Sequence, residues 1–331
     1  MNKTIFNFSI YTSLTFFQKG IGFIMLPIYT ALLSPHELGL FTQIMAICSI
    51  IILFFLFAMD EGAAFFLFKN KNNTLEKSKV FSSVFLISSL ISIFGSLIFL
   101  LFYKTLFSKF GIEITKNLAY IVIAYTITSP IFFIYQKILR INEEGVEFAK
   151  IMASYIAFQV VIAMILITKL NLGGIGLFIS HALTSIIFYI FSLTKLIKQY
   201  QLIFDFNNII KLSKYALPIL PHKISGWGLT GLTILSISYF LGSESVGIFS
   251  ALSFLSIIIN IFSKSFFNAY QPWVYQMMQG NNQQQSKILK MNKILGISMI
   301  ILATFLTFFS TEIISIFINS RYHTDFIILP V

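Results

Sequence analysis

Charged residues are scarce in this chain: Asp, Glu, Lys and Arg together supply 11% of the 331 residues, against 57% hydrophobic residues. The mean hydropathy is +0.86. Soluble domains carry about 25% charged residues, and a chain with less than half of that share falls outside their class. The long apolar runs therefore predict an all-α polytopic membrane protein, because a helix satisfies its own backbone hydrogen bonds in lipid.

Reactive side chains are also few. Cys48 is the single cysteine, which excludes an intrachain disulfide. The sequence contains no Walker motif, no Cys/His metal cluster and no nucleophile elbow, so we expect no ATP hydrolysis, no metal and no other cofactor. The net charge is +11, but the lysines lie in short loops between apolar runs, which indicates membrane orientation rather than nucleic-acid binding.

Apolar runs of membrane-spanning length follow one another along the whole chain. A helix needs about 20 residues to cross ~30 Å of hydrocarbon. A tenth run begins near Phe326 and the chain ends inside it at Val331, so we expect the sequence to be truncated at its C-terminus. The nine expected spans are residues 7–32, 39–59, 80–102, 117–138, 150–169, 172–194, 213–240, 246–268 and 294–311.

Lysine and arginine are distributed unevenly between the two sides of these spans. If the N-terminus is cytoplasmic, 16 of the 23 Lys and Arg residues lie in or beside the inside loops and 5 in the outside loops. The excess of positive charge on one side predicts that the N-terminus is cytoplasmic.

Two short segments look like copies of one motif: LSPHELGLF at 33–41 and LGSESVGIF at 241–249. Each joins one expected span to the next through an acidic turn and a glycine. The offset is 208 residues and contains six spans, so the copies have the same orientation in the membrane. We therefore expect two six-helix lobes in a parallel repeat: an N-terminal lobe at 1–200, and a C-terminal lobe at 201–331 that lacks about three spans.

Lys19 lies deep within the first expected span, where an ammonium costs roughly 3 kcal/mol on insertion scales. At 3.6 residues per turn, one side of this span is apolar and the polar side chains gather with Lys19 on the other. We expect this face to line a cavity for an anionic ligand; a structural pair with a carboxylate is the alternative. The candidate cavity residues are Tyr11, Thr12, Thr15, Gln18 and Lys19, with Gly22 and Pro27 as candidate hinges.

Lys223 is the second candidate cation, in the seventh expected span, which is the counterpart of the first in the repeat. Pro218, Pro221 and Gly226 surround it, and we expect them to act as hinges, because proline removes a backbone donor and frees a carbonyl. Such carbonyls are tolerated in a membrane only inside protein or beside a cavity. The evenly weighted alternative is that Lys223 is shallow and extends its ammonium to the inner interface.

Several stretches, taken together, resemble the O-antigen branch of the polysaccharide flippases, within the multidrug/oligosaccharidyl-lipid/polysaccharide exporters. The resemblance covers nearly the whole chain, and the order and spacing of the stretches are more specific than any one of them. The stretches are LPIYTALLSPHELGLFTQI, FAMDEGAAFFLFKN, YQKILRINEEGVEFAKI, LGGIGLFISHAL, KYALPILP, SISYFLGSESVGIFSAL and INSRYHTDFIILP.

The resemblance implies a transporter and not an enzyme: two lobes that rock about a central cationic cavity in the bacterial cytoplasmic (inner) membrane. The implied substrate is an oligosaccharide on a polyprenyl diphosphate, moved to the outer leaflet for surface polysaccharide such as the O-antigen of lipopolysaccharide. Lys19 and Lys223 would neutralise the diphosphate. Arg140 matches the usual basic position of the hairpin. From the residues alone, an ordinary solvated interface is the default expectation for Asp60 and Glu61, and a cap or gate at the inner end of the second span is the alternative. Membrane lipid and other polysaccharide-assembly membrane proteins are the further partners expected.

Three other functions remain open at this stage. A multidrug antiporter of the same superfamily would need carboxylates in its cavity to bind cationic drugs, whereas the mid-span charges here are lysines. A membrane enzyme, such as an O-antigen polymerase or acyltransferase, would need a long outside loop or a cluster of His, Asp and Arg. A non-functional truncated fragment is the third.

The predicted topology can be tested at the loop after the third span. A reporter fused after Lys109 is expected to lie outside the cytoplasm, because two crossings separate this loop from the loop before the second span, which is itself outside. Paired alkaline phosphatase and fluorescent-protein fusions measure this. A cytoplasmic Lys109 would overturn the assignment of spans.

Overall fold

The computed structural model describes residues 21–22, 24–70, 73–253, 256, 258–259, 262–263 and 282–322, with side chains from 289 onward in the last range. All regular elements in these ranges are helical. Seven of the described helices are long and apolar enough to cross a membrane, and they coincide with seven of the nine expected spans. The other two, 7–32 and 246–268, lie partly outside the described residues, and the run after Phe326 lies wholly outside them.

The chain divides into two compact units. In the described residues, unit 1 comprises 32–247 and unit 2 comprises 21–31 together with the segments after 247. The predicted lobes at 1–200 and 201–331 stay a prediction, since the compact units are not the same division.

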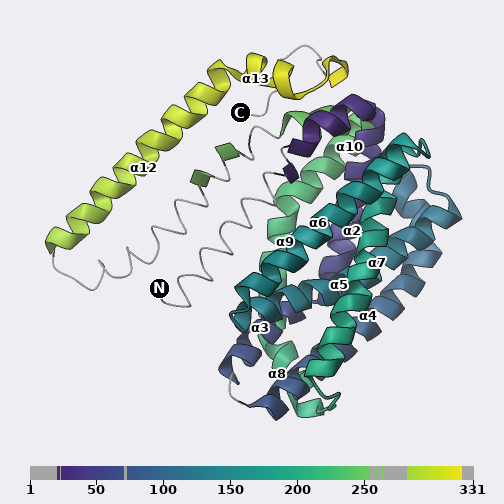
Figure 1. Ribbon diagram of the computed structural model, residues 1–331, viewed down its shortest axis with the longest axis vertical. Helices are drawn as coiled ribbons and strands as arrows, with labels where there is room; N and C mark the ends of the chain where they lie inside the picture. Colours follow the sequence, from purple (N-terminus) through teal and green to yellow (C-terminus); the bar gives the residue numbers. More distant parts are fainter. Residues whose placement is uncertain are drawn as a thin grey trace. The chain divides into compact units, whose positions relative to one another are not determined.

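Unit 1 is built around three helices, α2 (Pro35–Leu56), α5 (Lys116–Ile141) and α7 (Gly173–Gln199), which pack on one another. α6 (Gly145–Thr168) covers α7, and α4 (Thr74–Ser108) packs on α5 and α2, so that these helices run side by side in Figure 1. Hydroxyl groups join the centre: the Ser185 hydroxyl lies 2.8 Å from that of Thr128 and 3.1 Å from that of Ser129.

α4 buries polar residues and exposes apolar ones, which is the opposite of a helix in a soluble protein. Its buried residues include a row of serines, whereas many of its leucine, isoleucine and phenylalanine side chains, such as Leu101 at 77% exposure, face outward. Small and polar residues let membrane helices approach closely, and lipid solvates the apolar face. At 1.5 Å per residue the 35 residues of α4 extend over ~52 Å, so that its charged first turns reach beyond ~30 Å of hydrocarbon.

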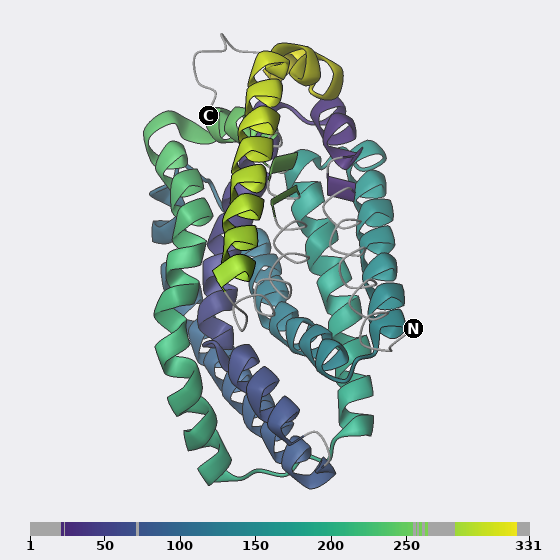
Figure 2. The same ribbon diagram turned by 90° about the vertical axis from the view of Figure 1, so that its left-hand side faces the viewer.

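A helical rod that starts at Phe206 runs along one side of unit 1 (Figure 2), and its last segment is kinked at Gly242. Its helical geometry changes where proline and glycine concentrate: a 3-10 turn, η1 (Leu217–Ile219), contains Pro218, and a π-helical turn, η2 (Gly228–Leu232), starts at Gly228. The three segments of the rod that flank these turns are α8 (Phe206–Ala216), α9 (Leu220–Trp227) and α10 (Thr233–Leu252).

The two copies of the repeated motif meet in unit 1. The chain breaks at equivalent positions, at Ser34 with extended geometry and at Gly242 with φ +81°, and a helix restarts after each. A Cβ on Gly39 would overlap the Ser243 carbonyl, and one on Gly247 would overlap the carbonyl of Pro35. Gly39 is equivalent to Gly247 in the repeat, and Pro35 to Ser243, so each contact is the counterpart of the other, as a local two-fold relationship produces.

The described part of unit 2 contains α12 (Asn282–Phe308), α13 (Ser310–Phe317) and a 3-10 turn, η3 (Ser320–Tyr322), together with helical residues 24–31. The Asn319 backbone N–H donates to the Thr30 hydroxyl at 3.4 Å, which joins the end of the first helix of the chain to the turn after α13.

Substitution at the close crossing is expected to separate the two motif copies. Gly39→Ala should cost about 1–3 kcal/mol, because the new methyl group meets a backbone carbonyl that cannot rotate away. Gly296→Ala is the matched control, because nothing lies within 4 Å of its added Cβ, and it should be neutral or stabilising. Thermal unfolding in detergent measures both, and equal midpoints would contradict the close approach.

Candidate functional site: an acid–base cluster in unit 1

The second expected span ends at a sharp break. α2 extends over 22 residues, or ~33 Å, which matches the hydrocarbon thickness. Phe57 and Ala58 follow with φ of 49° and 55°, a left-handed conformation that costs non-glycine residues about 1–3 kcal/mol each. The chain then restarts as α3 (Met59–Lys69), with Asp60 and Glu61 in its first turn, where the helix dipole favours negative charge.

Two lysines from other helices converge on these carboxylates. The Lys223 ammonium, from α9, donates to both oxygens of Asp60, at 2.6 and 2.7 Å, and lies 3.2 Å from Glu61. The Lys137 ammonium, from α5, lies 3.0 Å from Asp60 and also pairs with Glu61. We call these four residues the acid–base cluster. It joins three helices through charge-assisted hydrogen bonds, which are about twice as strong as neutral ones.

Burial differs within the cluster. The Asp60 side chain is 7% exposed, whereas Glu61 is 36% exposed and both lysines are near 25%. Burial opposes ionisation of Asp60, but the charges and hydrogen bonds of Lys137 and Lys223 outweigh it and hold the pKa of Asp60 below its ordinary 3.8. The same competition lowers the pKa of Glu61. Both carboxylates are therefore ionised at neutral pH, and two lysines lie opposite them to balance their charge.

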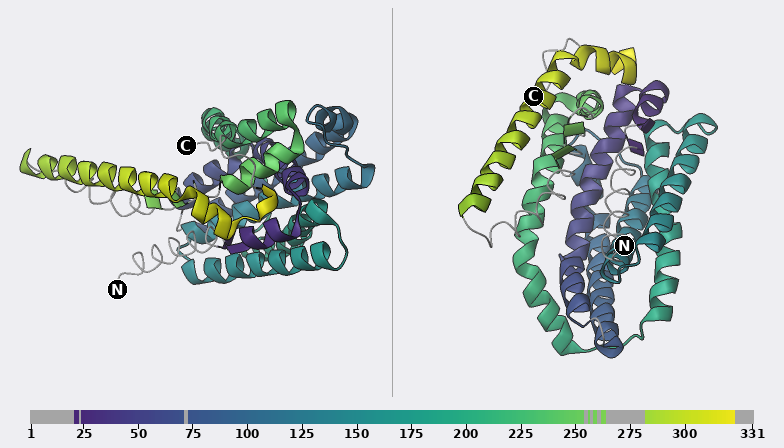
Figure 3. Two further views of the ribbon diagram at one scale, coloured as in Figure 1. Left: turned by 90° about the horizontal axis from the view of Figure 1, so that it is seen from above. Right: turned by 60° about the vertical axis from the view of Figure 1, so that its left-hand side comes forward.

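The cluster ends a line of polar contacts between α2/α3 and the rod, which we call the seam. Trp227 donates from Nε1 to the Ser49 hydroxyl at 2.9 Å, and Gln43 donates to Ser238 at 2.8 Å and accepts from Ser243 at 3.0 Å. α2 and the rod lie side by side in the right-hand view of Figure 3.

Lys223 also borders open space. It lines a pocket of about 250 Å³ together with Ser49, Ile52, Leu53 and Leu56 of α2. Lys223 thus pairs with the carboxylates through its ammonium and also lines a small cavity along the seam. An anion that entered this cavity would compete with Asp60 and Glu61 for the same lysine.

Comparison with protein families decides the relationship of the chain. The sequence model of a family described as polysaccharide biosynthesis protein matches residues 18–325. The chain belongs to this family. No curated protein and no solved structure gives a significant match. The family agrees with the resemblance to polysaccharide flippases, and with the membrane-helical fold it indicates a transporter-type polysaccharide biosynthesis protein.

The remaining predicted site residues of this polysaccharide biosynthesis protein are dispersed. Tyr11, Thr12, Thr15, Gln18 and Lys19 lie outside the described residues, so the anion site around Lys19 stays a prediction. Gly22 and Pro27 lie in helical segments of unit 2, and Pro218, Pro221 and Gly226 lie in the rod beside Lys223. Arg140 lies in the last turn of α5, outside the acid–base cluster, with its guanidinium 4.6 Å from the centre of the Phe148 ring.

The sequence did not reveal Lys137 as a partner of Asp60, because this lysine lies at the very end of the expected span 117–138, next to the charged hairpin. The structure extends α5 to Ile141 and begins α6 at Gly145, so Lys137 is a helical residue one turn inside the hairpin. The sequence does contain a signal for this pair. Asp60 follows an apolar span and needs a cation that lies at the same depth in the membrane. Lys137 is 21 residues from the start of α5, and Asp60 is 25 residues from the start of α2.

Asp60 should contribute far more to stability than Glu61. Asp60→Asn leaves two lysines partly buried with one carboxylate between them, and should cost about 2 kcal/mol, below the 3–5 kcal/mol of a fully buried pair. Glu61→Gln, at a more exposed position, should cost less than about 1 kcal/mol. Thermal inactivation in detergent measures the stability of both variants. A larger loss of stability for Glu61→Gln than for Asp60→Asn would contradict the greater burial of Asp60.

Proposed function

We propose that this protein is a flippase that moves an anionic, lipid-linked oligosaccharide across the membrane for polysaccharide synthesis. The observation that carries the proposal is the acid–base cluster: two lysines held by carboxylates on separate helices, beside a cavity that Lys223 lines. The family supports the role in polysaccharide synthesis. A diphosphate linkage supplies the anion that such lysines bind.

The neutral cluster suggests how binding is coupled to movement. Lys223 and Lys137 are paired at rest, so the site does not hold an uncompensated charge in a region of low dielectric constant. When a diphosphate enters the cavity, it exchanges with the carboxylates as the partner of Lys223. The exchange releases α3 from α9 and opens the seam at this end, while Gly39 and Gly247 keep its other end closed.

Movement outward is favoured by charge. When the inside of the cell is negative, each negative charge that moves outward lowers the free energy by about 2.3 kcal/mol per 100 mV. Lys19, in the first span, is the proposed second cation of the path, with Tyr11, Thr12, Thr15 and Gln18 as the proposed sugar contacts. The inner membrane, with the N-terminus in the cytoplasm, is the proposed location.

The acid–base cluster argues against the multidrug alternative. A cationic drug would need a carboxylate that is open to the cavity. Asp60 and Glu61 are both engaged by lysines, and it is Lys223 that borders the pocket. The site as described therefore offers its cation, and not its anions, to a ligand.

Complementation of a strain without its own flippase tests the proposal. Lys223→Ala should reduce surface polysaccharide about tenfold or more, as expected for the loss of one hydrogen bond to a charged group. Lys223→Arg should retain most of it, and Lys104→Ala, an exposed lysine at the far end of α4, is the control. Normal polysaccharide with Lys223→Ala at matched expression would refute the role of Lys223.

A variant in which the charges of Asp60 and Lys223 are swapped distinguishes two roles of this ion pair: binding an anionic substrate, and only holding α3 and α9 together. Asp60→Lys combined with Lys223→Asp restores the ion pair between α3 and α9 but moves the cation out of the lining of the pocket. We expect thermal stability to recover and polysaccharide export not to recover. Recovery of both stability and export would show that the ion pair only holds the two helices together.

A further inference from the structure

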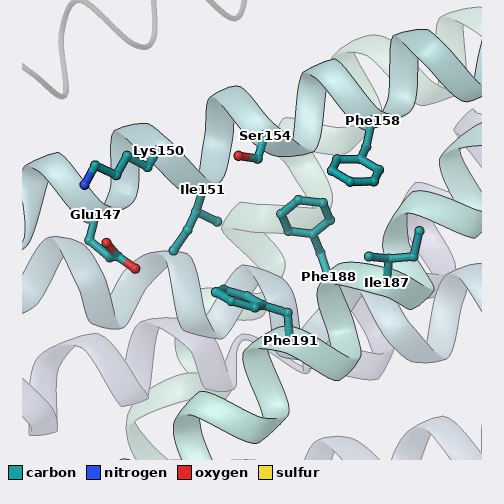
Figure 4. A pocket seen from close by; sticks show the side chains of 8 residues that line it. All are labelled: Glu147, Lys150, Ile151, Ser154, Phe158, Ile187, Phe188 and Phe191. Atoms are coloured by element: carbon teal, nitrogen blue, oxygen red, sulfur yellow. The ribbon is translucent and has the colours of Figure 1, made fainter.

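A second amphiphilic site lies on the other side of unit 1, between α6 and α7. Figure 4 shows a pocket there, of about 350 Å³, whose apolar lining includes Ile151, Phe158, Phe188 and Phe191. Glu147 and Lys150 lie together at one end of this pocket, and Phe158 lies at the other. Phe158 is 50% exposed, so the groove opens toward the surrounding lipid.

The charged end of this groove continues into a polar basin of about 480 Å³. Glu147 lines both pockets, and Glu144, Lys195 and Lys198 line the basin. The Lys195 ammonium lies 5.6 Å from the centre of the Phe191 ring, which belongs to the apolar groove. The basin and the groove are therefore adjoining parts of one site, polar at one end and apolar at the other.

The charges in the basin are of both signs and are not paired with each other. Within the part of the chain that the structure describes, Lys195 and Lys198 form no ion pair, and neither do Glu144 and Glu147. The lysines come from the end of α7 and the glutamates from the start of α6. A ligand that spans the basin thus meets cations on one helix and carboxylates on the other.

We propose that this site binds a phospholipid whose headgroup carries a phosphate and a primary ammonium. The phosphate pairs with Lys195 and Lys198, and the ammonium donates hydrogen bonds to Glu144 and Glu147. One acyl chain lies in the groove between Phe158 and Phe191. Basic pockets between transmembrane helices are known to bind lipid headgroups, and the added pair of glutamates selects the primary amine over a purely anionic headgroup.

Lipid binding to the purified, delipidated full chain tests the assignment. Phosphatidylethanolamine, phosphatidylcholine and phosphatidylglycerol with identical acyl chains are titrated separately, and native mass spectrometry measures the bound fraction. The wild type should prefer phosphatidylethanolamine over both, because phosphatidylcholine has no N–H donor for the glutamates and phosphatidylglycerol has no cation. Equal binding of the three, or a preference for phosphatidylglycerol, would overturn the proposal.

Paired variants assign each half of the headgroup. Glu144→Gln with Glu147→Gln should reduce the preference for phosphatidylethanolamine about fivefold, the scale of an exposed ion pair. Lys195→Ala with Lys198→Ala should weaken all three lipids, whereas Lys104→Ala with Lys109→Ala, on exposed lysines of another region, should not. If the two double lysine variants lose the same amount of lipid binding, the lysines attract lipid nonspecifically and the proposed site is wrong.

Two further arms keep the test independent of folding and of the proposed transport. Phe158→Ala should weaken binding, and Phe102→Ala, on an α4 ring that is 60% exposed against 50% for Phe158, should leave it unchanged. A polyprenyl phosphate added as competitor should not displace phosphatidylethanolamine. If it does, the site belongs to the transported lipid and the proposal fails, whatever the outcome at Lys223.

Discussion

A buried carboxylate must have its charge compensated, and in this protein that requirement organises one end of unit 1. Asp60 lies at the point where the second span ends, and its side chain is almost removed from solvent. Each of the two cations that compensate it comes from a different helix. The charge on one side chain thereby determines how α3, α5 and α9 come together, and a change of partner at that carboxylate changes the contacts of all three.

The two ends of the seam rely on different physics. At the end with the repeated motif, Gly39 and Gly247 allow two backbones to touch, and the contact is short-ranged and insensitive to charge. At the other end, long side chains join the helices through ions, and such contacts can be exchanged for a competing ion. A substrate that carries phosphate can act on the second kind of contact but not on the first.

Much of the architecture could be predicted, because lipid imposes simple rules on a sequence. Seven spans were located from apolar runs alone, since each crossing must satisfy its own backbone. The 3-10 turn of the rod contains Pro218, one of the residues expected to act as a hinge, and the hinge role itself stays a prediction. The repeated motif indicated a relationship between two segments, but not that Gly39 and Gly247 would touch.

The acid–base cluster was less accessible from the sequence. Pairing between Lys223 and Asp60 depends on the rotation and depth of two helices that are 163 residues apart, and periodicity fixes neither. Lys137 lies at the end of the expected span 117–138, and span boundaries from hydropathy are uncertain by a turn, which decides whether a lysine is solvated or paired. A site whose residues come from several helices therefore cannot be predicted from the sequence alone.

The reciprocal crossing of Gly39 and Gly247 also has a consequence for synthesis at the ribosome. Its two sides are 208 residues apart, and chains grow at about 5–20 residues per second, so the first side exists for roughly 10–40 s before the second emerges. During this time Gly39, near the start of α2, lacks the backbone partner that it has in the folded unit. The two backbones can pack against each other only after this interval, so α2 and the rod come together late in synthesis.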